Sequence, residues 1–62
     1  MIKVKNTTYQ ITKADGSRTM EITLCTTSEK KFIDAYQRLA QDYPEQEGYQ
    51  IKYLKETFET IN

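Results

Sequence analysis

The fold is decided by residues 9–24, which read YQITKADGSRTMEITL. Asp15-Gly16 is the strongest hairpin signal in the chain, because both residues tolerate the positive φ that a type I′ turn requires. Apolar and polar residues alternate on both sides of this turn, as expected of strands with one buried face. With a two-residue loop, the directly opposed pairs are Ile11 with Met20, Tyr9 with Ile22, and Thr7 with Leu24. The stretch therefore predicts an antiparallel hairpin with one apolar face.

The two strands of this hairpin are predicted over residues 2–13 and 18–26. The first strand has a fault in its alternation, since Ile2 and Val4 are even-numbered and the apolar residues nearer the turn are odd-numbered. Successive side chains point to opposite faces, so a regular strand would expose one of the two sets. We favour a β-bulge near Asn6-Thr7, which would keep both sets in the core.

A helix is predicted over residues 28–42. Thr27 and Ser28 can cap its start, and Pro44 stops it. The apolar side chains recur at helical spacing and form one stripe: Phe32, Ile33, Tyr36, Leu39, Ala40 and Tyr43. A polar loop is expected over residues 44–48.

A third strand is predicted from Tyr49, where apolar and polar residues alternate again. Two interpretations remain open for residues 54–62. Leu54, Phe58 and Ile61 have the spacing of a short helix, whereas the threonines between them favour a strand. We favour one long strand with an irregularity near residues 54–56.

The order of elements predicts a small α+β fold, a two-layer β-β-α-β sandwich. It has a three-stranded antiparallel sheet in the order 2-1-3 with one helix packed on one face. A chain of 62 residues is expected to form a single domain over residues 1–62.

Composition excludes several classes of protein. Nine basic residues balance nine acidic ones, and the chain has one Cys and no His. A structural zinc site of Cys and His is therefore excluded, as is an internal disulfide. The apolar runs are far shorter than the roughly 20 residues that span a bilayer. We expect a cytoplasmic protein with no membrane contact.

The sequence offers little catalytic chemistry. Cys25 is the only strong nucleophile, and no His is present to form its thiolate. No phosphate-binding glycine loop is present. We expect a protein that is not an enzyme and has neither a cofactor nor a bound metal.

One helix can cover only one face of the sheet, so the other face is either solvated or a flat binding platform. We expect that face to carry polar side chains, with Lys3 and Lys5 among them if the bulge near Asn6-Thr7 is real. The candidate binding residues are Lys3, Lys5, Thr12, Thr19, Glu21, Thr23 and Lys52.

Two functions are compatible with this surface. The first is a small binding module that acts by protein–protein contact, as an accessory factor or an inhibitor of a larger protein, of the kind that mobile elements often encode. A homodimer through an edge strand fits the same class, and the Thr-rich second strand is the edge we expect to pair. The alternative is weak nucleic-acid binding through a basic hairpin face, made by Lys3, Lys5, Lys13 and Arg18.

Overall fold

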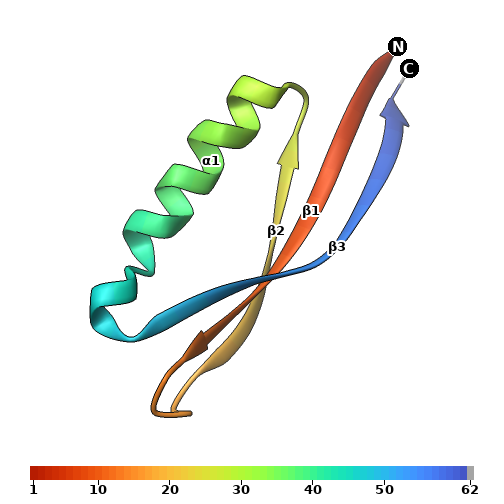
Figure 1. The fold of residues 1–62 in the computed structure, drawn as a ribbon. Coiled ribbons are helices and arrows are strands. Elements are labelled where there is room, and N and C mark those ends of the chain that lie inside the picture. The colour runs from red at the N-terminus through yellow and green to blue at the C-terminus, as the bar shows by residue number, and fades with distance from the viewer. Residues whose placement is uncertain (62) are drawn as a thin grey trace.

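The computed structural model describes residues 1–61. Within them the chain forms β1 (Ile2–Lys13), β2 (Thr19–Thr26), α1 (Glu29–Asp42), the short 3-10 helix η1 (Glu45–Glu47) and β3 (Tyr49–Ile61). The strands lie in the order β2-β1-β3, and both neighbouring pairs are antiparallel (Figure 1). The predicted α+β fold is confirmed. The favoured long third strand is also confirmed as far as Ile61, and Asn62 lies outside the described residues.

The hairpin has the predicted register but not the predicted turn. Ile11 lies opposite Met20, and the other expected pairs follow in the same register. Among the described residues only glycines have positive φ, so Gly16 adopts it (75°) and Asp15 does not. The type I′ turn was therefore a wrong prediction. Asp15 Oδ1 instead accepts a 2.8 Å hydrogen bond from the Ser17 amide, a local bond that favours a different turn.

The β-bulge lies in the third strand rather than in the first. Pairing of β1 with β2 runs without a shift, whereas Thr8 lies opposite Lys55 and its neighbour Tyr9 lies opposite Tyr53. Leu54 is the extra residue, which confirms the irregularity expected near residues 54–56. The bulge expected near Asn6-Thr7 was wrong, because Ile2 is not drawn into the core and remains exposed.

The core is small and lies between α1 and the middle of the sheet. Its buried hydrophobic members are Tyr9, Ile11 and Leu39. Partly buried side chains pack around them: Met20, Ile22, Leu24, Phe32, Tyr43, Tyr49 and Ile51. In the predicted helical stripe, Ile33 and Tyr36 are exposed. The helix begins as expected, with Ser28 Oγ accepting from the Lys31 amide at 3.2 Å.

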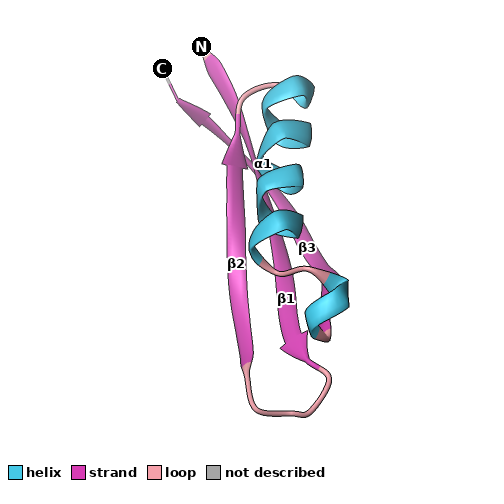
Figure 2. Cartoon of the chain, turned by 90° about the vertical axis from the view of Figure 1, so that its left-hand side faces the viewer, coloured by secondary structure: helices cyan, strands magenta, loops and turns pink. Residues whose placement is uncertain are grey.

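The helix is too short and too far to one side to cover the sheet. Its 14 residues rise about 21 Å, whereas the 13 residues of β3 extend about 43 Å. α1 lies nearest to β2, at the edge opposite β3 (Figure 1). Figure 2, turned by 90° from Figure 1, shows the start of β1 and the end of β3 extending beyond the helix. The helix therefore leaves the β3 side of its own face uncovered.

Candidate functional site

Most of the predicted binding residues share the face of the sheet that points away from α1, which we call the open face. They occupy neighbouring rows, because Thr12 pairs with Thr19 on one side and Gln50 on the other. Gln10 lies between Glu21 and Lys52 in the next row. The structure thus brings together five of the seven candidates: Thr12, Thr19, Glu21, Thr23 and Lys52.

The open face is polar apart from Val4, Ile2 and Ile61 near the chain ends, and hydrogen bonds join some of its side chains. Thr8 lies between Thr23 and Lys55 in its row, and its hydroxyl is 3.0 Å from that of Thr23. At the far end of the face, Asn6 Nδ2 donates to Glu59 Oε1 at 2.9 Å. Of the five candidates on this face, Thr23 is the one that takes part in these bonds among the described residues.

Lys3 and Lys5 lie on the opposite face from the other candidates. Since β1 has no bulge, both have the parity of Tyr9 and point to the side of α1. Lys5 Nζ lies 4.0 Å from the centre of the Phe32 ring and 3.8 Å from Glu56 Oε1. Their expected place on the open face was wrong, because it depended on the bulge.

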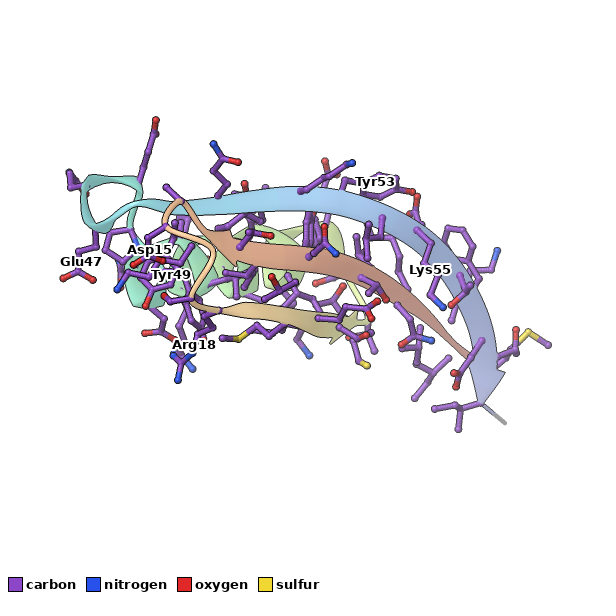
Figure 3. The ribbon with its side chains drawn as sticks, turned by 90° about the horizontal axis from the view of Figure 1, so that it is seen from below. Asp15, Arg18, Glu47, Tyr49, Tyr53 and Lys55 are labelled. Atoms are coloured by element: carbon purple, nitrogen blue, oxygen red, sulfur yellow. The ribbon has the colours of Figure 1, made fainter. Side chains whose placement is uncertain are left out.

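The basic residues of the hairpin do not form one surface. Lys5 and Lys13 are eight residues apart on a single strand, or about 26 Å. Lys13 Nζ lies 5.4 Å from the centre of the Tyr49 ring, and Arg18 belongs to the hairpin end (Figure 3). Charges spread over such a distance give few phosphate contacts in any one place.

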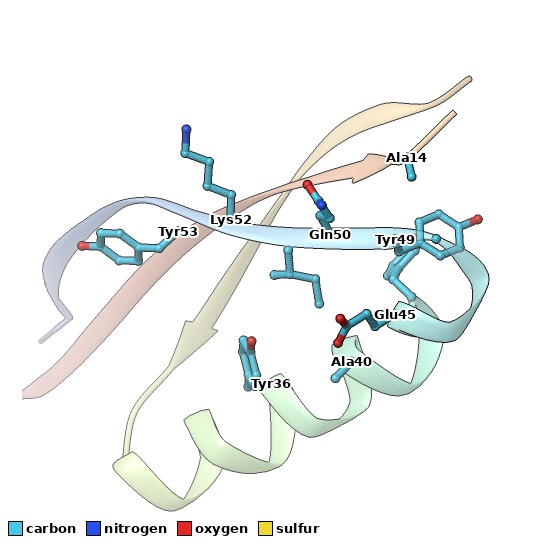
Figure 4. A pocket seen from close by; sticks show the side chains of 11 residues that line it. Ala14, Tyr36, Ala40, Glu45, Tyr49, Gln50, Lys52 and Tyr53 are labelled. Atoms are coloured by element: carbon cyan, nitrogen blue, oxygen red, sulfur yellow. The ribbon is translucent and has the colours of Figure 1, made fainter. Parts of the chain in front are cut away.

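A groove lies between α1 and the first half of β3, and we call it the tyrosine groove (Figure 4). Its volume is about 1010 Å³. Tyr36 and Tyr43 line it from the helix side, and Tyr49 and Tyr53 from β3, with Ile51 between them. It exists because α1 packs toward β2 and leaves the helix-facing side of β3 without a cover.

The tyrosines of the groove contact one another and the buried Tyr9. The rings of Tyr9 and Tyr36 lie 5.4 Å apart, and those of Tyr43 and Tyr49 lie 5.3 Å apart. Tyr9 also meets Tyr53 edge to face at 6.1 Å. Burial, reinforced by these neighbouring phenols and Glu56, raises the pKa of Tyr9 above its usual value. Tyrosine rings in and beside the groove therefore pack against one another.

A second exposed apolar region follows the bulge. Phe58 is 61% exposed, and Ile61 and Ile2 at the paired chain ends are also exposed. Phe58 and Ile33 border a smaller hollow of about 470 Å³ beside the start of α1. Figure 3 shows Tyr53 and Lys55 far from the hairpin end that Asp15 and Arg18 mark.

The whole molecule is extended for its size. A compact chain of 7.3 kDa exposes about 4200 Å², whereas this chain exposes 4798 Å². Its Cα radius of gyration is 13.0 Å, against about 10.6 Å for a compact domain of 62 residues. The excess surface comes from strands that extend past a short helix.

The sequence interpretation missed the tyrosine groove because it assigned the tyrosines to the core. No side-chain pattern marks the groove, because it follows from the lateral position of α1 toward β2. The thiol of Cys25 is free and exposed. Within residues 1–61, no group of three potential metal ligands is gathered in one place.

Comparisons with protein-family models, with curated proteins and with solved structures found no match. In the described part of the chain, no helix has the length and apolar character needed to cross a bilayer.

Proposed function

We propose that the protein is a binding module that acts by protein–protein contact and that the tyrosine groove is its contact site. The observation that carries this proposal is the groove itself, an open hollow lined by four tyrosines. Tyrosine is enriched at protein interfaces because it offers a large rigid area and one polar tip. We propose no catalytic role, so the module serves as an accessory factor or an inhibitor of a larger protein.

The sheet is wider than the helix that covers it. Three strands spaced about 4.8 Å apart span about 14 Å, whereas one helix is about 10 Å across. α1 occupies the β2 side of that width. A partner helix with an apolar stripe can lie over Ile51 and the neighbouring tyrosines, and this mode of recognition needs no change in the sheet.

The test compares partner binding by three baits. The parent protein is expected to retain a defined protein from lysate of the cells that produce it, and the retention should survive nuclease treatment. Tyr36→Ala removes one wall of the groove and is expected to lose that protein. Glu21→Ala, on the open face, is the matched control and should retain it. Loss with Glu21→Ala but not Tyr36→Ala would contradict the proposal, and salt-sensitive retention of nucleic acid would favour the alternative function.

A further inference from the structure

The second half of β3 has an unpaired edge. From Lys55 to Ile61 this strand pairs with β1 on one side only, since it is the outer strand of the sheet. Such an edge presents a row of backbone donors and acceptors to any strand that can align with it. The segment contains no proline. The Leu54 bulge separates it from the half of β3 that lines the tyrosine groove.

The charges of this segment are arranged for pairing with a copy of itself. Opposed residues in an antiparallel pair share a face. A two-fold axis normal to the sheet therefore passes between the two copies of one residue, which lie opposite each other, and we name the axis by that residue. An axis at Lys55, Glu56 or Glu59 would bring like charges together. An axis at Phe58 opposes no charges at all. An axis at Thr57 sets Lys55 opposite Glu59 of the second copy, and does so twice.

Among the described residues, the two charged residues that would meet form no ion pair. In the described residues the ion pair is between Lys5 and Glu56, on the helix side of the sheet. Lys55 and Glu59 lie on the open face, opposite Thr8 and Val4. Glu59 accepts one hydrogen bond from Asn6 and retains acceptor capacity for a lysine.

The apolar side chains of the segment gain cover in the same arrangement. With the axis at Thr57, Phe58 becomes the diagonal neighbour of Phe58 of the second copy, which is within reach of aromatic side chains. The formal net charge is zero, so two copies do not repel each other as wholes.

We propose that the segment Lys55–Ile61 pairs with the same segment of a second copy about a two-fold axis at Thr57, forming a continuous six-stranded sheet. The sequence pattern favours β2 as the edge that pairs. β3 is the better edge because α1 lies close to β2, and because the exposed apolar side chains follow β3.

The test is a charge-swap series measured by sedimentation equilibrium at fixed salt. Lys55→Glu and Glu59→Lys each replace two attractive pairs by two repulsive ones, so each is expected to weaken self-association about tenfold. An equimolar mixture of the two variants is expected to form a heterodimer of parental strength. The double variant K55E/E59K restores both pairs and should also associate like the parent.

Lys30→Glu is the matched control, since it makes the same charge change on the exposed side of α1. It is expected to leave self-association unchanged, as is Tyr36→Ala in the groove. Circular dichroism checks that each variant is folded. The mixture contains the same two single variants, so recovered association in the mixture shows that their weak self-association comes from charge and not from unfolding. A parent that stays monomeric at every concentration overturns the proposal. So does a mixture that associates no better than its components, or a Lys30→Glu effect as large as that of Lys55→Glu.

Discussion

Thr7 and Thr8 are adjacent buried residues whose hydroxyls have opposite surroundings. Thr7, only 2% exposed, has no hydrogen-bond partner for its hydroxyl oxygen among the described residues. Thr8 points to the open face and shares a hydrogen bond with Thr23. A buried hydroxyl without a partner costs free energy, whereas one with a partner contributes about 1 kcal/mol.

This contrast predicts opposite effects for the same substitution. Thr7→Val replaces the unpaired hydroxyl by a methyl group and is expected to raise the free energy of unfolding by about 1 kcal/mol. Thr8→Val removes a buried hydroxyl that shares a hydrogen bond with Thr23, so it should lower that free energy by about 1 kcal/mol. Denaturant unfolding of the two variants measures both. If both substitutions changed the free energy of unfolding in the same direction and by the same amount, hydrogen bonding of the two hydroxyls would not explain their effects.

Tyr9 is expected to make the free energy of unfolding depend on pH in the alkaline range. Its burial among phenols raises its pKa above the ordinary value of 10.0, so the folded state holds the proton more tightly than the unfolded state. The resulting stability is complete below pH 10.0 and is lost as the pH rises through the raised pKa. Tyr9→Phe has no proton to lose. Its unfolding free energy is therefore expected to fall less than that of the parent across this pH range, and an equal fall would contradict the assignment.

At the scale of elements, the start of α1 depends on one side chain. Ser28 Oγ caps the amide of Lys31, and such a cap contributes about 1 kcal/mol. Ser28→Ala is expected to lower the free energy of unfolding by about that amount. Thr27→Ala is the matched control, because the described cap uses Ser28 rather than its neighbour. Thermal unfolding followed by circular dichroism checks both variants, and a larger loss with Thr27→Ala would place the cap elsewhere.

The elements show which sequence patterns carry information. Strict alternation from Tyr9 to Leu24 was enough to predict the hairpin register, because a slip of one residue would expose every apolar side chain. The irregular strand near Leu54 was also predictable, since an apolar residue breaks the alternation there. The prediction of a bulge near Asn6-Thr7 was wrong because it required Ile2 to be buried. The turn differed because the side chain of Asp15 bonds locally to Ser17.

At the scale of the whole molecule, the candidate site could not be predicted from side-chain patterns alone. The stripe of α1 has the spacing of a core-facing helix, yet the helix packs toward β2 and leaves Tyr36 open. Periodicity states which side of a helix is apolar, but it does not state where on a sheet the helix lies. The tyrosine groove follows from that placement, whereas the unpaired edge of β3 follows from the strand order β2-β1-β3.

The central claim is that other chains bind on the β3 side of the molecule rather than on the open face near β2. The most direct measurement places a photoreactive aromatic residue at position 53 in one variant and at position 21 in another, followed by irradiation in the producing cells. We expect a discrete covalent adduct with another protein chain from position 53 and none from position 21. An adduct from position 21 alone would contradict it.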